Sequence, residues 1–515
     1  MMELYVSIRR NEYHDSLELL LATSILEGKD GIGKANVAMG NGNSFSVFRS
    51  LGLYTEEMAS TGPTDLIVAA EAESREIFDK SVAETFEQMT GRREEQHIQS
   101  CNTLEDALRL RGDAQVCVIS LPGEYAKDEA MKALRNGLHV VLFSSHIAPE
   151  DELELKKYAA SQGLLCMGPD CGVVNIAGTA FILSSVTRPG PFGLCGATGV
   201  GIQHVGALID RAGSGVTQII GTGGADLKAG EGITMLSGID ALEDDPATEY
   251  IVLVSRKPKD EVLAKILDRV KQCKKPVVGC FMGADPAVVE ASGAIYASDL
   301  DDAAVKALAL IGKTCDLQTD EDLDRLAAQA AQGMKPTQKY LRGLFTGGTY
   351  MEEAMRAIAP IAGPVHSNAP LAPELLLEDS LVSVENTCVD VGEDEFTMGK
   401  PHPTMEPSGR KPFIVKEGSD PEVCVLLLDF IFAVSANIDP VGIVLEDIQA
   451  AMANARANGG KLAVVAALCG TDGDFQNYAE QKRKLEQAGV YVCQTNRLAA
   501  KLAAKIAALQ NGGKA

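Results

Sequence analysis

One stretch of this chain limits its fold more than any other. The residues from Phe192 to Gly201 join a short apolar run to a glycine-dense turn, and apolar side chains then recur between Ile202 and Ile209 at the spacing of one helical face. A strand, a glycine turn and a helix start leave unpaired backbone N–H groups at the positive end of the helix dipole. The stretch therefore predicts an α/β unit with an anion-binding cradle, and a tight turn without a ligand is the alternative.

The spacing of the glycines differs from that of two common nucleotide-binding motifs. It reads G-x-x-G-x-G rather than the dinucleotide pattern G-x-G-x-x-G, and no Gly-Lys-Ser/Thr ending follows. Two further glycine turns, at 221–224 and 346–349, also follow apolar strands. Together the three turns favour a phosphate or acyl-phosphate site. Its predicted binding residues are Thr198, Gly199, Val200, Gly223, Gly224, Gly347, Gly348 and Thr349.

Strand and helix patterns alternate along the whole chain, and the strand patterns are continuously apolar. This combination is typical of parallel sheets covered by helices on both faces. We predict three parallel-sheet α/β domains, over 1–188, 189–313 and 339–515, with a polar, Ala- and Asp-rich helical linker over 314–338. The second and third domains share the order strand, glycine turn, helix, further strands, which suggests a structural duplication.

Charge and cysteine usage exclude several classes of protein. The net charge of −24 argues against nucleic acid and anionic membranes as partners. No apolar run approaches the roughly 20 residues that span a bilayer, and we expect no signal peptide. The 12 cysteines occur without a C-x-x-C or a zinc spacing, so we expect free thiols in a reducing cytoplasm, no metal site and no resident cofactor. For the acidic residues 393–395 a solvated loop is favoured over a metal site.

Several motifs of this chain occur together in one known superfamily. They are M-G-P-D-C-G at 167–172, the loop 193–201, G-A-T-G-V-G-I-Q at 196–203, G-T-G-G-A-D at 221–226, K-P-V-V-G at 275–279, F-T-G-G-T at 345–349 and G-K-P-H-P at 399–403. Through them the span from about Leu121 to Ile311 resembles the α subunit of succinyl-CoA synthetase and related NDP-forming acyl-CoA synthetases, and the third domain looks like the carboxy-terminal ligase domain of the β subunit. The whole chain resembles the FdrA family, a divergent branch of this superfamily. This implies a Rossmann-like, CoA-binding-like first domain and two flavodoxin-like ligase domains.

The chain departs from the synthetases where their chemistry is located. Ala291 stands in place of their phosphohistidine, and alanine cannot accept a phosphoryl group. Arg256 falls near the position of the glutamate that supports that histidine. The sequence Y-V-S-I-R-R at 5–10 replaces the glycine fingerprint that holds CoA. We therefore expect neither a phosphohistidine relay nor CoA thioester chemistry.

What remains is a pair of helix starts that, by resemblance, converge on one phosphate, with Arg256 as a catalytic cation and Lys257 adding charge. The FdrA resemblance implies a subunit of oxamate carbamoyltransferase in anaerobic allantoin degradation. That enzyme transfers a carbamoyl group between oxalurate and phosphate, giving oxamate and carbamoyl phosphate, and the family implies two companion subunits. The alternatives are an α-like subunit of an NDP-forming acyl-CoA synthetase and a non-catalytic scaffold subunit.

Five further side chains have two possible roles each, functional or structural. His402 lies on a proline-braced loop, where a catalytic acid/base and a structural loop histidine are equally good interpretations. Asp170 and Asp226 follow predicted strands, where open α/β sheets place ligands, so we predict that both bind substrate, with turn capping as the alternative. His204, next to a glycine turn, is expected to be structural, as is His146.

Overall fold

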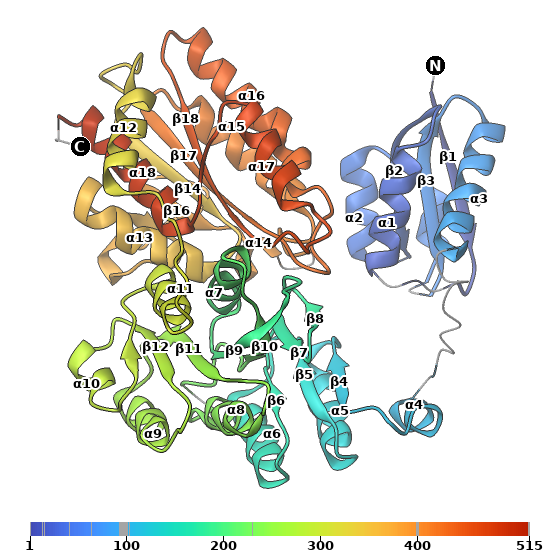
Figure 1. Ribbon diagram of the computed structural model, residues 1–515. Helices are drawn as coiled ribbons and strands as arrows, with labels where there is room; N and C mark the ends of the chain where they lie inside the picture. The colour runs from blue at the N-terminus through green and yellow to red at the C-terminus, as the bar shows by residue number, and fades with distance from the viewer. Residues whose placement is uncertain are drawn as a thin grey trace. The chain divides into compact units, whose positions relative to one another are not determined.

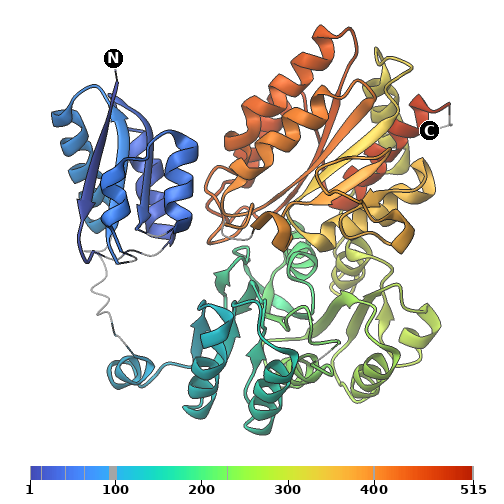
Figure 2. The ribbon, with the colours of Figure 1, turned by 180° about the vertical axis from the view of Figure 1, so that it is seen from behind.

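The computed structural model describes residues 2–12, 14, 16–40, 42–62, 64–91, 101, 103–228, 230–397 and 401–512. The chain divides into two compact units, Met1–Gly112 and Asp113–Ala515, and each is described by itself. Figure 1 and Figure 2 show the elements of each unit from opposite sides.

The first unit is a small antiparallel sheet with helices on both faces. In the order β1-β3-β2, β3 lies between two strands that are parallel to each other and antiparallel to it. Leu26 and Phe78 pack on one face, and Phe48 and Met58 on the other. Its elements are β1 (Glu3–Arg9), α1 (Ser16–Glu27), β2 (Ile32–Met39), α2 (Gly42–Leu51), η1 (Glu56–Ser60), β3 (Leu66–Ala72), α3 (Arg75–Gly91) and α4 (Leu104–Leu110).

The second unit begins with a three-stranded parallel sheet, β4-β5-β6. Its buried strand residues Val141 and Met167 share a core with helices of the next sheet. The elements are β4 (Val116–Ile119), α5 (Gly123–Arg135), β5 (His139–Leu142), α6 (Pro149–Ser161) and β6 (Cys166–Met167).

A seven-stranded sheet follows, in the order β13-β12-β11-β9-β10-β7-β8. Its first five strands are parallel, and the hairpin β7–β8 adds antiparallel to β10. The strands are β7 (Val173–Ile176), β8 (Thr179–Ile182), β9 (Pro189–Gly196), β10 (Val216–Gly221), β11 (Tyr250–Arg256), β12 (Val277–Met282) and β13 (Ile295–Tyr296). The helices are α7 (Gly199–Arg211), α8 (Ile233–Asp244), α9 (Asp260–Val270), α10 (Pro286–Glu290) and α11 (Leu300–Ala309).

The last sheet has six parallel strands in the order β15-β16-β14-β17-β18-β19. They are β14 (Tyr340–Phe345), β15 (His366–Ser367), β16 (Thr387–Asp390), β17 (Val423–Ile431), β18 (Ala463–Cys469) and β19 (Tyr491–Cys493). The helices are α12 (Asp320–Ala331), α13 (Gly348–Ala362), η2 (Pro373–Leu375), α14 (Asp394–Thr397), η3 (Pro407–Arg410), α15 (Lys411–Ser419), α16 (Pro440–Ala457), α17 (Tyr478–Gln487) and α18 (Asn496–Gln510).

One continuous core joins the two larger sheets of the second unit. It contains Ile202 of α7, Leu300 of α11, Met355 of α13 and Leu502 of α18, together with buried residues of both sheets. Helices α15, α16 and α17 cover the opposite face of the six-stranded sheet (Figure 1). Because α7 and α13 share this core, their starts are held by the same packed layer.

The predicted fold class, α/β with several parallel sheets, is confirmed. The prediction of one parallel sheet over residues 1–188 is wrong, because residues 3–72 form an antiparallel sheet in a unit that ends at Gly112. The alternation of strands and helices along the chain does not show the order of strands within a sheet, so it did not reveal that β3 lies between β1 and β2. β7 and β8 also precede residue 188 yet belong to the seven-stranded sheet. No helix within the described part of the chain is long and apolar enough to cross a membrane.

Candidate functional site

The starts of helices α7 and α13 meet, as the resemblance to the synthetases implied. Thr198 is the N-cap of α7 and accepts a hydrogen bond from Gly201 N at 3.3 Å, and Gly347 is the N-cap of α13. The hydroxyl groups of Thr198 and Thr349 lie 2.6 Å apart. Gly347 faces Val200 so closely that a Cβ on it would lie 2.9 Å from Val200 Cγ2. Two sets of unpaired helix N–H groups therefore point to one place.

Strand register brings Arg256 to the same edge. β9 and β11 are parallel neighbours, with Gly196 opposite Val254, so the end of β11 extends beside the start of α7. Arg256 Nη2 lies 3.6 Å from the point where a Cβ on Gly348 would be. Its Nε is 2.6 Å from Glu352 Oε2, which orients the guanidinium from α13.

A cavity of about 300 Å³ opens at this place. Arg256 and Gly348 line it together with a second cation, Arg356, which is paired with Glu352 at 2.9 Å. A space of this size fits a small oxyanion with a small organic group attached. The remaining lining residues are Met351, Glu352, Ala369, Pro370, Leu371 and Glu393.

Asp390, at the end of β16, is a buried acid beside the helix start. Its Oδ1 accepts a hydrogen bond from Gly392 N at 2.8 Å, and its Oδ2 lies 3.1 Å from the Cβ position of Gly348. Burial raises the pKa of Asp390 to about 7, and the carboxylates of Glu393 and Asp429 add to the rise. The Gly392 N–H and Arg256 act in the opposite direction. Near neutral pH both protonation states of this carboxyl group are therefore populated.

His402 lies on the same loop as Asp390. Its Nε2 is 2.8 Å from the Cβ position of Gly392, and Asp390 Oδ1 is 3.0 Å from that point. Thr404 N donates to Nδ1 at 3.2 Å, so in the neutral ring the proton is on Nε2. Burial lowers the pKa of His402 to about 4, which keeps the ring neutral at pH 7. The structure brings His402 to the site as a neutral donor; Gly399 and Lys400 of its motif lie outside the described residues.

Buried polar contacts hold α7 and α13 together near their starts. His204 Nδ1 is 2.5 Å from the hydroxyl group of Tyr350, and its Nε2 is 2.9 Å from Asp301 Oδ1 on α11. His204 therefore has the structural role that we expected. Donors held in this way need little reorganisation when an anion binds.

A second buried group supports the turn that leads into α13. Both carboxylate oxygens of Asp429 accept from Thr346 N at 3.0 Å. Arg410, 2% exposed, donates to Asp429 O and Leu344 O and is 3.3 Å from the Asp429 carboxylate. This pair joins the ends of β14 and β17 beneath the site.

Four predicted binding residues lie at another pair of loops. Gly223 packs against the Gly168–Pro169 peptide, where a Cβ would lie 2.4 Å from Pro169 O, while around Gly224 the Cβ position is open. Asp170, whose N–H donates to Ser144 O, is exposed on the same loop as Pro169. Asp226 is fully buried, accepts from Thr234 N and Met235 N, and so caps α8.

The contacts of Asp226, and of Lys257, which was also predicted to bind the anion, indicate their roles. Asp226 Oδ1 is 2.7 Å from Lys156 Nζ in a fully buried ion pair, which supports the capping interpretation rather than substrate binding. Lys257 extends from the end of β11 and is 2.8 Å from Asp260, with 44% of its side chain exposed. Lys257 therefore follows Arg256 in the sequence, but its ion-pair partner does not line the cavity beside Arg256.

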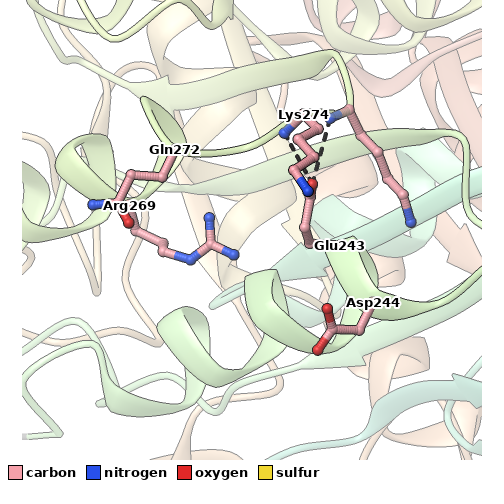
Figure 3. A pocket seen from close by; sticks show the side chains of 6 residues that line it. Glu243, Asp244, Arg269, Gln272 and Lys274 are labelled. Carbon is pink, nitrogen blue, oxygen red and sulfur yellow. Dashed lines mark hydrogen bonds between the residues drawn. The ribbon is translucent and has the colours of Figure 1, made fainter.

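A larger cavity, of about 460 Å³, lies before the amino end of β12 (Figure 3). Figure 3 shows Glu243 accepting from the backbone of the Lys274 segment, at 2.9 Å from Lys274 N. Lys275 Nζ donates to Leu242 O and Asp245 O, and Arg269 pairs with Asp240 at 2.6 Å. Because these cations already stabilise the carboxyl end of α8, this cavity is not a candidate site. Its other lining residues are Asp244 and Gln272.

Sequence reasoning missed Asp390 and Glu352. The V-D-V-G segment at 389–392 carries a signal for the first, because it places an acid after a buried strand and before a glycine, as at Asp170. Glu352 carries no such signal, since a glutamate in the second turn of an amphipathic helix is ordinary.

Known proteins are similar to this chain over both of its units. Residues 344–506 match the CoA-ligase family model, and residues 2–104 match the family model described as AllF, heavy metal-associated domain. The uncharacterized protein YahF of Escherichia coli (strain K12) is 38% identical over 96% of this chain and 97% of its own length. The succinate–CoA ligase α subunit of Methanothermobacter thermautotrophicus is 25% identical over 33% of this chain and 58% of its own. PH0766 from Pyrococcus horikoshii OT3 is a structural neighbour at TM-score 0.33 and 15% identity, covering 81% of this chain and 88% of that one.

The second unit thus has the fold type of acyl-CoA ligases that resemble the succinyl-CoA synthetase α subunit. The described residues of the first unit do not form a soft-metal site. Residues 2–104 contain one cysteine, Cys101, and His14 is hydrogen-bonded to Glu12 and Glu18. Among the residues with described coordinates, no group of three or more His, Cys, Asp or Glu side chains could hold a metal ion.

Proposed function

This chain belongs to the family of the Escherichia coli protein YahF, and from that premise we propose that it binds phosphate between two ligase-type helix starts and transfers a carbamoyl group to it. The proposed reaction converts oxalurate and phosphate into oxamate and carbamoyl phosphate, with the chain acting as an FdrA-type subunit beside two companion subunits. The proposal places this chemistry in anaerobic allantoin degradation.

The contact of Thr198 with Thr349 at 2.6 Å carries the proposal. It holds the start of α7 against the start of α13, where Gly348 and Arg256 line the cavity. An anion there receives backbone N–H groups and a guanidinium, which hold a phosphate oxygen against a carbamoyl carbon and stabilise the charge that develops. Direct attack by phosphate needs no phosphohistidine, which agrees with Ala291.

The first test removes the cation. Arg256→Ala is expected to weaken phosphate binding by roughly ten- to a hundredfold, because it removes a charge-assisted hydrogen bond worth about 1.5–3 kcal/mol. Arg256→Lys keeps the charge but loses the planar fork, so a smaller loss is expected. Isothermal titration with phosphate measures the affinity. Arg269→Ala, which removes an arginine from the cavity of Figure 3, is the matched control. Equal affinity in Arg256→Ala and in the wild type would contradict the placement.

The protein is expected not to form a phosphohistidine. Ala291, at the end of α10, is exposed and has no group that can be phosphorylated. Incubation with γ-labelled nucleoside triphosphate, or with succinyl-CoA and labelled phosphate, followed by alkaline gel analysis should leave the chain without acid-labile label. A synthetase α subunit treated in parallel should take up label. Stoichiometric label on this chain would instead support the second candidate below.

The second candidate function is that of an α-like subunit of an NDP-forming acyl-CoA synthetase. The similarity to succinate–CoA ligase α subunits favours it. The two candidates differ in their ligands, since the synthetase requires CoA and the carbamoyltransferase does not. Carbamoyl phosphate formation by the assembled complex from oxalurate and phosphate, without CoA, supports the proposed function; CoA-dependent acyl phosphate turnover supports the second candidate. Activity of the companion subunits without this chain would support a scaffold role.

A further inference from the structure

The carboxyl group of Asp390 lies beside the proposed anion site, which is an unusual place for an acidic side chain. The residue is 4% exposed, and its Oδ1 is held by Gly392 N. Its other oxygen, Oδ2, is 3.1 Å from the Cβ position of Gly348, and Arg256 Nη2 is 3.6 Å from the same point. Within the described part of the chain, no protein donor lies at hydrogen-bond distance from Oδ2. A buried acceptor is thus directed at the place where the helix starts and the arginine converge.

A carboxylate in this position discriminates among anions. When ionised it can only accept hydrogen bonds, so it repels an oxyanion that carries no proton. Hydrogen phosphate keeps one P–OH group at pH 8 and can donate it. Sulfate has the same shape and charge but no proton near neutral pH. A site built around such a bond rejects the analogue that cannot make it.

We propose that Asp390 makes this cradle selective for hydrogen phosphate over sulfate, by accepting the P–OH hydrogen bond at Oδ2. The inference rests on the proposed phosphate site and adds its specificity. It also explains why an acid lies beside helix starts that otherwise favour any anion.

The selectivity depends on pH. Because the pKa of Asp390 is raised to about 7, the group is mostly ionised at pH 8 and mostly protonated at pH 6. A protonated carboxyl group can donate to sulfate, so the preference for phosphate should shrink on acidification. His402 stays neutral over this range, since burial lowers its pKa to about 4. The other ionisable groups that face Asp390 from neighbouring elements are Arg256, Glu393, Arg410 and Asp429.

The test is calorimetric titration of the full-length chain with sodium phosphate and with sodium sulfate, at pH 8 and at pH 6. The wild type is expected to bind phosphate about 100-fold more tightly than sulfate at pH 8, with a smaller ratio at pH 6. Asp390→Asn replaces the acceptor with an amide that can donate. It should keep phosphate binding within about tenfold and bring sulfate within about tenfold of phosphate at both pH values. Asp268→Asn, on the surface of α9, should behave as the wild type.

Each outcome decides the question. Equal binding of phosphate and sulfate by the wild type at pH 8, or unchanged selectivity in Asp390→Asn, would overturn this inference while leaving the phosphate site intact. Absence of phosphate binding in the wild type would overturn the proposed site and this inference with it. If Asp390→Asn does not fold, Asp390→Ser and the pH dependence of the wild type supply the same comparison.

Discussion

Replacing Gly348 with valine is expected to lower the phosphate affinity of the chain roughly 100- to 10,000-fold. A Cβ at this position would lie 3.1 Å from Asp390 Oδ2 and 3.6 Å from Arg256 Nη2, and the two methyl groups of valine would fill the remaining space. The anion then loses the first N–H of α13 and its contact with Arg256, two charge-assisted bonds of about 1.5–3 kcal/mol each. Carbamoyl transfer by the assembled complex should fall with it, because the attacking oxygen is no longer positioned.

The helix itself should tolerate the change. Valine costs less than about 1 kcal/mol in a helix, so circular dichroism and the denaturation midpoint should move little. Gly409→Val is the matched control, because nothing lies within 4 Å of its Cβ position. Phosphate affinity in Gly348→Val equal to that of Gly409→Val, in folded protein, would place the anion elsewhere.

Lys156→Met is expected to destabilise the second unit by about 3–5 kcal/mol, because it leaves two carboxylates buried without their cation. Lys156 Nζ lies 2.7 Å from Asp226 and 3.1 Å from Glu152, and the lysine side chain has no exposed surface. Although burial works to lower it, these carboxylates raise the pKa of Lys156 above its ordinary value. The lysine also donates to Thr222 O, in the glycine turn after β10. The ion pair therefore fixes that turn against α6.

Denaturant titration of the full-length chain measures this loss, with Lys157→Met on the exposed side of the same helix as a control expected within about 0.5 kcal/mol of the wild type. The deficit should depend on pH. Without the cation, the folded-state pKa of Glu152, which burial already raises, rises further above its unfolded value. Stability then falls as pH rises through that interval, and the deficit is smaller at pH 5 than at pH 8. A deficit equal to that of Lys157→Met would show that the buried pair is not a structural support.

The sequence was sufficient for those parts of the fold that depend on local patterns. The apolar runs before the three glycine turns located β9, β10 and β14 within a few residues, because strands buried on both faces leave little ambiguity. The antiparallel sheet of the first unit could not be read in this way. Its direction depends on which strand lies between the other two, and β3 enters between β1 and β2 only in three dimensions.

The same distinction separates the predicted and missed parts of the site. Glycine turns mark helix starts locally, so Thr198, Gly348 and Thr349 were predicted, and parallel register places Arg256 beside them. Asp390 belongs to another strand, and its raised pKa arises from burial that no sequence window reveals. Asp226 also follows a strand, yet its carboxylate is already paired with Lys156 and hydrogen-bonded to the start of α8. A strand-end acid therefore does not show by itself whether it faces a cavity or a helix.

A crystal structure of the full-length chain, grown with phosphate and without sulfate, tests the central claim most directly. The predicted result is one phosphate bound at the starts of α7 and α13, accepting from Gly348 N and from a hydroxyl group of Thr198 or Thr349, with Arg256 in contact and its P–OH directed at Asp390. A cradle that stays empty at phosphate concentrations that saturate binding in solution, with the anion on other residues of the chain, would contradict the account.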